Sequence, residues 1–286
     1  MVDPAKATRV LEPDPLPPPA PLTLVGHRPR TLLSFDLEEC DIPLEYGTDV
    51  SPERQLEITT EGLPGLLALL DRLDIRATFF TTAHYALHRQ QQVAAIAERH
   101  EIASHGCFHK GLRPGDLERS RDVLQSITGQ PVEGFRMARM APVDGAQVRA
   151  AGYRYCSSEN PTWLPGRYNR FFARRTTHTA HGVVQIPASV TPLLRFPLFW
   201  LSVKNFPPSL IRAAARWVLA HDRYLSLYFH PWEFADLSGL GLPWFVAGRD
   251  GERMLARLRD LLAWLAARSA FVTYADHVAS LDTPHA

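Results

Sequence analysis

Short apolar runs that alternate with one-sided helical stretches constrain the fold of this chain more than any other feature of its sequence. The runs lack the polar alternation of half-exposed strands, which is typical of parallel strands buried on both faces. They lie at residues 31–36, 75–80, 102–104, 132–135, 153–156, 183–186, 224–229 and 271–273. We expect a parallel α/β fold, and this pattern alone does not separate a barrel from an open sheet.

The segments between these runs predict helices. Residues 61–74 carry leucine at positions 63, 66, 67, 70 and 73, the spacing of a helix with one buried face. Further helices are expected at residues 90–100, 114–128, 143–151, 209–220 and 251–268.

The remaining segments predict loops. Residues 40–58 and 157–182 lack periodicity, so we expect long loops at the rim of the sheet. Residues 187–208 contain five prolines around an apolar stretch, and we expect them to cap the sheet or to pack on a partner. Residues after 273 are predicted to be a short tail.

The domain organisation follows from where this alternation begins. Residues 1–30 are rich in proline and have no periodicity, so they predict an extended N-terminal arm. Residues 31–286 predict a single domain, because no domain-scale linker interrupts them.

Composition narrows the setting of the protein. The net charge is +1, which gives no bulk attraction to nucleic acid. Three scattered cysteines (Cys40, Cys107 and Cys156) fit a reducing compartment better than a disulfide framework. No transmembrane segment and no secretory signal are predicted, so we expect a cytoplasmic protein. The oligomeric state stays open.

Two groups of polar residues after the predicted strands suggest a metal site. His105 and His109 are four residues apart, so on a helix or tight turn both could bind one ion; alone, such a pair also fits local hydrogen bonding. Asp36, Glu38 and Glu39 follow an apolar strand, and carboxylates this close raise one another's pKa unless a cation neutralises them. Two imidazoles and one carboxylate would hold a divalent metal and leave positions for water and substrate.

Two further residues follow predicted strands. His230 comes after residues 224–229, where it is either a general acid that protonates a leaving amine or a hydrogen-bonded structural histidine. Arg136 comes after residues 132–135, where it either orients a basic carboxylate or forms an ordinary ion pair. Both interpretations stay open at this level.

In this order the motifs resemble those of the polysaccharide deacetylases, the carbohydrate esterase group built on the NodB homology domain. An acidic cluster, His-x-x-x-His, Gly-Phe-Arg and a strand ending in histidine follow one another over roughly residues 31–280. The resemblance implies a distorted (β/α)7–8 barrel and a hydrolase that removes an N-acyl, less often O-acyl, group from a sugar. It also places the chain in a divergent branch.

The resemblance assigns a role to each matching residue. Asp36 corresponds to the general base. The adjacent position, a metal-binding aspartate in most relatives, is Leu37 here, so the ligand is expected two residues after the base, at Glu38, with Glu39 as the alternative.

The other assignments follow in the same way. His105 and His109 correspond to the metal-binding histidines, Arg136 to the arginine that steers the base, and His230 to the catalytic acid. The arginine motif continues to Arg139 without the usual proline, and Glu38 is a longer ligand than aspartate. These departures leave open a shifted metal, an altered acyl pocket or a loss of activity. Arg139 is a candidate for binding a substrate phosphate or carboxylate, and Trp232 is a candidate for stacking on a sugar ring.

We therefore predict a metal-dependent deacetylase, a hydrolase of carbon–nitrogen bonds other than peptide bonds. Its expected cofactor is a divalent metal, best matched by Zn²⁺, and its expected substrate is an amino sugar or saccharide precursor, not a nucleic acid. Two alternatives stay open. One is a metal-independent amidohydrolase of the same fold that acts on a small amide or ureide, and the other is a non-catalytic saccharide-binding protein.

Overall fold

The computed structural model describes residues 28–282 except 166 and 167. The predicted N-terminal arm lies outside the described residues as far as residue 27, and the first strand already begins at Arg30.

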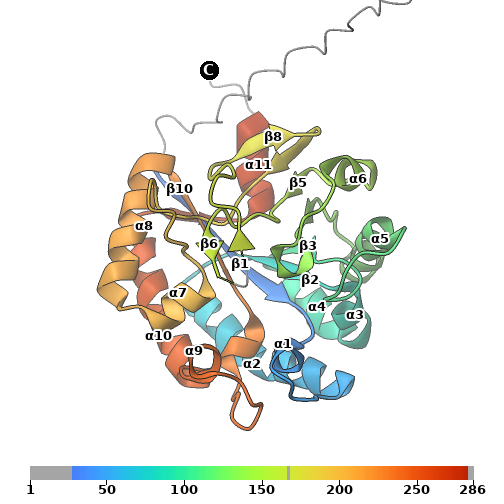
Figure 1. Cartoon of the computed structure of the whole chain (residues 1–286). Helices are drawn as coiled ribbons and strands as arrows, with labels where there is room; N and C mark the ends of the chain where they lie inside the picture. The colour runs from blue at the N-terminus through green and yellow to red at the C-terminus, as the bar shows by residue number, and fades with distance from the viewer. Residues whose placement is uncertain (1–27, 166–167, 283–286) are drawn as a thin grey trace, which may run out of the picture.

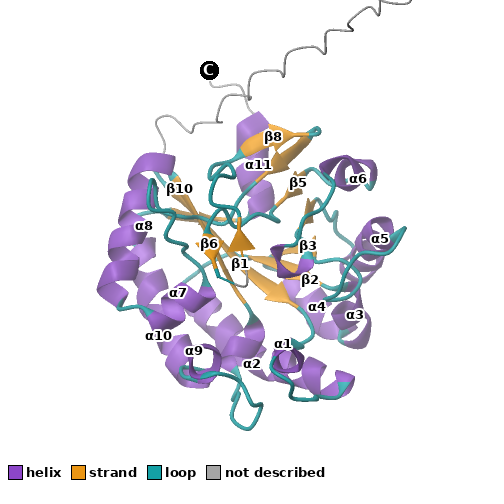
Figure 2. Ribbon diagram, viewed as in Figure 1, coloured by secondary structure: helices purple, strands orange, loops and turns teal. Residues whose placement is uncertain are grey.

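A single curled sheet forms the centre of the described chain (Figure 2), and its strand order is β10-β1-β2-β3-β4-β5-β9-β8. One edge of β1 is shared, because its first residues pair with β11 and its last residues pair with β2. All neighbours are parallel except β8 and β9. The strands are β1 (Arg30–Leu37), β2 (Thr78–Thr81), β3 (Glu101–Ser104), β4 (Gly134–Phe135), β5 (Tyr155–Cys156), β8 (His178–Ala180), β9 (Val183–Gln185), β10 (Tyr224–Phe229) and β11 (Ala270–Val272).

Helices surround this sheet (Figure 1) and cover it with leucine-rich faces, such as Leu63, Leu66 and Leu70 of α2 and Leu258, Leu261 and Leu262 of α10. The predicted (β/α) barrel fold is confirmed in this distorted form. The helices are α1 (Ile42–Glu45), α2 (Pro52–Arg72), α3 (Ala83–His88), α4 (Gln90–Ala97), α5 (Asp116–Thr128), α6 (Gly145–Ala150), α7 (Trp200–Asn205), α8 (Pro208–Asp222), α9 (Trp244–Ala247), α10 (Gly251–Ala266) and α11 (Tyr274–Asp282), with 3-10 turns η1 (Ala138–Met140) and η2 (Pro231–Phe234).

The prediction that residues 40–58 form a loop is wrong in its second half. Helix α2 begins at Pro52, where the Ser51 side chain accepts a hydrogen bond from the Arg54 backbone N–H at 3.3 Å. Serine followed by proline is a strong helix start, because the serine caps a free N–H and the proline needs no partner there. Within α2, Gly62 packs so closely on η2 that a Cβ atom would lie 1.9 Å from the Pro231 carbonyl oxygen. This close contact supports the turn that follows β10.

Two other loop predictions also need correction. Residues 157–182 contain a short hairpin of β6 (Trp163–Leu164) and β7 (Tyr168–Asn169), followed by β8. The predicted tail after residue 273 is the helix α11, whose Tyr274 is fully buried.

Residues 187–208 divide into a buried and an exposed part. Leu198, Phe199 and Trp200 are each at most 2% exposed, which agrees with the expected cap, whereas Leu193 and Leu194 are exposed.

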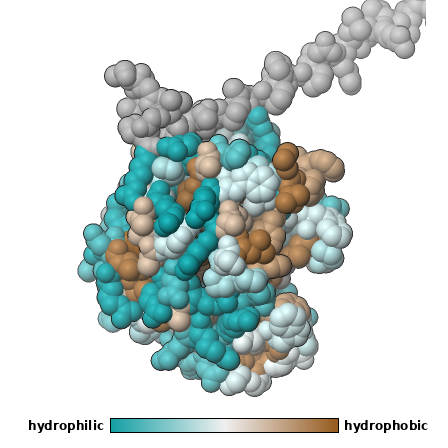
Figure 3. Space-filling view, turned by 90° about the vertical axis from the view of Figure 1, so that its left-hand side faces the viewer, coloured by the Kyte–Doolittle hydropathy of each residue, from teal (hydrophilic) through white to brown (hydrophobic). Residues whose placement is uncertain are grey.

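The distribution of hydrophobic residues on the surface agrees with the burial of apolar side chains in the core. Hydrophilic residues predominate on the face in Figure 3, and hydrophobic residues form separate areas. None of the described helices is long and apolar enough to cross a membrane.

The buried His277 of α11 generates a prediction about acid stability. Neither of its ring nitrogens meets a hydrogen-bond partner among the described residues. Burial, with a smaller contribution from Arg30, lowers its pKa from 6.5 to about 3. His277 therefore binds a proton near pH 6.5 in the unfolded chain but only near pH 3 in the folded chain. Because the unfolded chain binds more protons between these values, folding stability falls as the pH falls through this window.

We expect His277→Phe to remove this loss. The free energy of unfolding is measured in urea for the variant and the wild type. The difference between them should increase in favour of the variant by about 1.4 kcal/mol for each pH unit below pH 6.5. The same change at His221, exposed on α8, is the matched control. Parallel pH profiles of His277→Phe and the wild type would contradict the prediction.

Candidate metal centre and active site

The end of β1 carries the acidic residues of the site. Asp36 and Glu38 both line one small cavity, whereas Leu37 between them belongs to the hydrophobic core. This division follows from the alternation of side chains along a strand. The carboxylate of Glu39 lies elsewhere and accepts a hydrogen bond from the Thr82 hydroxyl at 2.8 Å. The structure therefore brings Glu38, and not the alternative Glu39, to the histidines.

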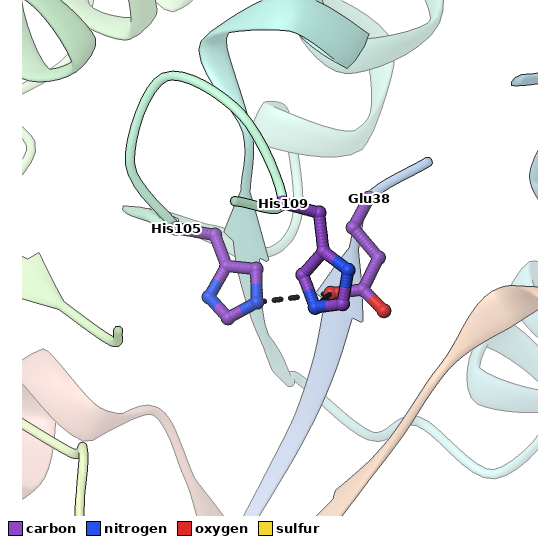
Figure 4. A group of neighbouring side chains, drawn as sticks. All are labelled: Glu38, His105 and His109. Atoms are coloured by element: carbon purple, nitrogen blue, oxygen red, sulfur yellow. Dashed lines mark hydrogen bonds and ion pairs between the residues drawn. The ribbon is translucent and has the colours of Figure 1, made fainter. Parts of the chain in front are cut away.

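The two histidines follow β3 and converge on Glu38 (Figure 4). Glu38 Oε2 lies 2.9 Å from Nε2 of His105 and 2.9 Å from Nε2 of His109. The two imidazole rings stack with their centroids 5.6 Å apart and an interplanar angle of 24°. One atom from each of the three residues could contact a single ion, because all three atoms lie within 4.8 Å of one another.

Hydrogen bonds on the far side of each ring decide which nitrogen faces Glu38. His105 Nδ1 lies 2.9 Å from the Arg136 carbonyl oxygen, and a carbonyl only accepts, so Nδ1 carries the proton. His109 Nδ1 lies 2.8 Å from Asp41 Oδ1. Such partners are typical of metal-binding histidines, because they leave Nε2 free as the donor to the metal.

The charges in this cluster call for a cation. Burial alone would raise the pKa of the Glu38 carboxyl, but His109 and His105 hold it well below its usual value. Burial opposes a charge on His109, yet Glu38 and Asp41 raise its pKa well above the usual value. Both pKa shifts favour positive charge beside the Glu38 carboxylate. The donor set fits a divalent metal, which would supply that positive charge.

Arg136 contacts the Asp36 carboxylate on the side away from the histidines. It is fully buried, and its Nη1 lies 2.5 Å from Asp36 Oδ1. The other carboxylate oxygen, Oδ2, lies 4.0 Å from His105 Nε2 and 3.9 Å from His230 Nε2. The arrangement leaves Oδ2 free to face the centre of the site.

His230 lies across the site from the other two histidines. Its Nε2 is 3.8 Å from Glu38 Oε1, and its ring stacks on Trp232 with centroids 4.7 Å apart. On its other side, Glu233 Oε1 accepts a hydrogen bond from the His230 backbone N–H at 2.8 Å and lies 3.1 Å from His230 Nδ1. Glu233 therefore fixes the ring so that Nε2 faces the carboxylates.

A buried lysine stands behind Glu233. Lys204 Nζ donates to the Val246 carbonyl oxygen at 2.7 Å and lies 3.6 Å from Glu233 Oε2, an ion-pair distance. Both side chains are fully buried. Burial lowers the pKa of Lys204, and Glu233 opposes that shift. Removing either side chain would leave the other buried without its partner.

The cavity at this site holds about 20 Å³, room for roughly one water molecule or ion. Arg139 of η1 reaches across its mouth to Asp41, with Nη2 2.9 Å from Oδ2, and also pairs with Glu45. Arg139 adopts a left-handed backbone conformation with φ 58°. A substrate would have to separate Arg139 from these carboxylates to enter.

All eight residues predicted for the site line this cavity or contact a residue that does. The sequence-based analysis missed Asp41, Glu233 and Lys204. Asp41 ends the acidic run that contains Asp36, and Glu233 lies three residues after His230, so spacing could have suggested both. The signal for Lys204 was weak, because it is only a single charged residue directly after the apolar segment 198–203.

Comparison with known proteins supports the predicted resemblance. Residues 49–156, which include both histidines and Arg136, match the family model described as polysaccharide deacetylase. No curated protein sequence matches the chain. The resemblance to polysaccharide deacetylases is therefore confirmed, for a divergent sequence.

Solved structures share the fold. A putative polysaccharide deacetylase from Mycobacterium smegmatis superposes with a TM-score of 0.66 at 20% identity, covering 95% of this chain and 98% of that one. The Puue allantoinase superposes with a TM-score of 0.60 at 16% identity, covering 94% of this chain and 96% of that one. At these identities the likeness extends to the fold and not to the chemistry.

The Lys204–Glu233 pair generates a prediction about stability. Removing one partner of a buried ion pair leaves the other charge uncompensated, so Lys204→Met should lower the free energy of unfolding by about 3–5 kcal/mol. The double variant Lys204→Met/Glu233→Gln should recover most of this loss, because no buried charge remains. Denaturant unfolding followed by circular dichroism measures both.

The matched control is Arg99→Met, which removes an exposed ion pair with Asp74 that spans 2.6 Å. Its cost should stay below about 1 kcal/mol. A similarly small cost for Lys204→Met would show that the buried pair does not require both charges.

Proposed function

We propose that the protein is a metal-dependent deacetylase that hydrolyses the N-acetyl group of an amino sugar or saccharide precursor. One observation carries the proposal. His105 and His109 direct their Nε2 atoms at the same oxygen of Glu38, each at 2.9 Å, while Asp36 and His230 flank that carboxylate. This set supplies a metal site, a base and an acid within one small cavity.

Glu38, His105 and His109 would hold the metal. A divalent cation bound there, for which imidazole and carboxylate donors favour Zn²⁺, would polarise the acyl carbonyl and lower the pKa of water. Asp41 supports this function by holding His109 through Nδ1. The sequence-based expectation of a cytoplasmic protein agrees with a saccharide precursor as substrate.

Asp36 acts as the general base. Arg136 occupies its Oδ1, so Oδ2 is the oxygen that takes a proton from the attacking water. The guanidinium group also fixes the direction of the carboxylate. A base held in one orientation loses little entropy when it meets the water.

His230 acts as the general acid. Glu233 holds its Nδ1 side, so Nε2 delivers the proton to the leaving amine as the C–N bond breaks. Trp200 meets the His230 ring edge-on at a centroid distance of 5.4 Å and helps to exclude water from it. The acid thus lies close to both carboxylates, with His230 Nε2 3.9 Å from Asp36 Oδ2 and 3.8 Å from Glu38 Oε1.

Arg139 and Trp232 complete the assignment as substrate-binding residues. A phosphate or carboxylate on the substrate would replace Asp41 and Glu45 as the partner of Arg139, which opens the cavity at the same time. Trp232 lines the cavity and also supports the site, since its Nε1 lies 3.4 Å from Glu38 Oε1.

Two alternatives predict different results. The fold of the Puue allantoinase is compatible with a metal-independent hydrolase of a small amide or ureide. A non-catalytic protein would bind a saccharide in the same cavity without hydrolysing it. The two imidazoles that face one oxygen of Glu38 favour the metal-dependent enzyme over both.

The first experiment measures metal. Purified wild-type protein should bind about one Zn²⁺ or similar divalent cation per chain, as expected for a site with one set of ligands, and lose it on chelation. His105→Ala and His109→Ala should bind none by elemental analysis and isothermal titration calorimetry. Glu39→Gln is the matched control and should bind metal normally. Full activity after exhaustive chelation would reject the metal role.

The second experiment measures acetate released from N-acetylglucosamine oligomers and from N-acetylated sugar precursors. Asp36→Asn and His230→Gln should each lower the rate by about 10²–10⁴ while metal binding persists, because each removes one proton-transfer group. His230→Gln leaves the Arg136–Asp36 pair intact, so it separates catalysis from folding.

Three outcomes would contradict the deacetylase proposal. Wild-type rates in both variants would remove the assigned base and acid. Hydrolysis of allantoin without metal, and no acetate release, would favour the metal-independent amidohydrolase. Saccharide binding without hydrolysis of any probe would favour the non-catalytic protein.

A further inference from the structure

Four large hydrophobic side chains are exposed on loops beside the candidate active site. Their exposed fractions are 94% for Phe172, 82% for Leu193, 73% for Leu194 and 60% for Trp163. We call these four residues the rim patch. Single exposed hydrophobic residues are common on proteins, but a group on adjoining loops marks an interaction site.

Hydrogen bonds join the loops of the rim patch into one surface. We call residues 191–196, which include Leu193 and Leu194, the leucine loop. Arg195 Nη1 donates to the Ala173 carbonyl oxygen at 2.9 Å, which connects the leucine loop to the loop of Phe172. The Thr162 hydroxyl donates to the Arg195 carbonyl oxygen at 2.8 Å, which connects the leucine loop to the residue before Trp163. The four side chains therefore belong to one continuous region.

The leucine loop is a rigid turn that holds its side chains outward. Thr191 closes it, with its backbone N–H donating to the Phe196 carbonyl oxygen at 2.9 Å and its hydroxyl accepting from the Phe196 N–H at 3.0 Å. Leu193 has φ 62° and Arg195 has φ 53°, left-handed conformations that are unfavourable for residues with a side chain. A turn needing only this shape would favour glycine or asparagine, so the exposed leucines indicate contact with an apolar environment.

The segment of sequence that carries the rim patch is rich in arginine. Residues 160–221 contain seven arginines and one lysine but no aspartate or glutamate, a formal charge of +8. The rest of the chain must therefore carry −7, since the net charge is +1. Arg170, Arg174, Arg175 and Arg195 lie in the same loops as the patch, where Arg170 and Arg175 pair with Glu159 and Asp222 from outside this segment.

The rim patch is also connected to the active-site cavity. Trp163 pairs with Asn169 in the β6–β7 hairpin. The neighbouring Tyr168 lines the cavity, and its hydroxyl lies 3.1 Å from the hydroxyl of Tyr228 at the end of β10. The β6–β7 hairpin therefore contains both Trp163, a residue of the rim patch, and Tyr168, a residue that lines the cavity.

We propose that the rim patch binds the surface of a lipid bilayer that contains anionic headgroups. Leucine, phenylalanine and tryptophan side chains enter the region between headgroups and acyl chains, while arginines beside them pair with phosphates. A second copy of this chain is a poor occupant, because a self-complementary contact would bring two positive surfaces together.

The surface also identifies the substrate class, a conclusion that rests on the proposed function. A membrane-bound protein with its cavity beside the bilayer would receive an N-acetylated amino sugar linked to a lipid through phosphate. Arg139, at the mouth of the cavity, is the residue placed to meet that phosphate. The lipid part of such a substrate would stay in the bilayer while the sugar enters the cavity.

Vesicle co-sedimentation tests the binding directly. The full chain should sediment with vesicles of phosphatidylcholine and phosphatidylglycerol, and much less with phosphatidylcholine alone or at high salt. The double variant Leu193→Asp/Leu194→Asp should bind the anionic vesicles at least tenfold more weakly. The matched control Leu87→Asp, at a 51% exposed leucine on α3, should bind like the wild type.

Several outcomes would overturn the proposal. These are no binding of the wild type to anionic vesicles, equal binding to both vesicle types, and an equal loss of binding in the control. A wild-type dimer in solution that the leucine variant disrupts, without vesicle binding, would assign the patch to a second copy instead. Binding to an acidic protein in the absence of any vesicle binding would assign it to a protein partner.

The binding and the chemistry can fail separately. Asp36→Asn should bind anionic vesicles normally while losing acetate release. The leucine double variant should keep wild-type acetate release from soluble N-acetylglucosamine oligomers. Its rate on an N-acetylated amino sugar carried by a lipid phosphate in vesicles should fall at least tenfold, and an unchanged rate there would reject the lipid-linked substrate.

Discussion

The structure depends most on the buried guanidinium group of Arg136. All five of its N–H groups meet an acceptor, and these acceptors are Ser34 Oγ, Asp36 Oδ1, the carbonyl oxygen and Oγ of Ser157, and the hydroxyl of Tyr274. These contacts join β4 to β1, to the segment after β5 and to α11. A buried charge is tolerated only when it is paired and fully hydrogen-bonded, so the network fixes both the sheet and the direction of Asp36.

From Asp36 the charges alternate across the site. Lys204 balances Glu233, Glu233 holds His230, and His230 faces Asp36 and Glu38. On the other side His109 lies between Glu38 and Asp41, and Arg139 closes the series beyond Asp41. Because each group compensates its neighbours in a medium of low dielectric constant, the effects of single substitutions should not add. The same alternation favours a cation between Glu38, His105 and His109, where one atom from each residue lies within 4.8 Å of the others.

Access to the site and contact with the surroundings share one part of the chain. The small cavity is closed by Arg139, while the β6–β7 hairpin connects it to an exposed apolar and basic surface. The positive charge of residues 160–221 would draw anionic groups toward the cavity mouth whether they belong to a substrate or to a surface. The hairpin and loops of the exposed surface are thus distant in sequence from Asp36, Glu38 and the histidines, but the hairpin lies beside their cavity.

Most strands of the main sheet, their parallel arrangement and the polar residues that follow them could be predicted from the sequence, whereas the β6–β7 hairpin and the antiparallel strand β8 could not. Strand length, apolar runs and the position of Asp36, His105 and His230 are local features, and the ends of parallel strands must meet at one edge of the sheet. Tertiary contacts were needed to bring Glu38 and not Glu39 to the histidines, to include Asp41 and Lys204 in the site, and to form helix α11 where the sequence predicted a tail. These depend on side-chain direction and on partners distant in sequence, such as Asp41 with His109, whose contact no local periodicity encodes.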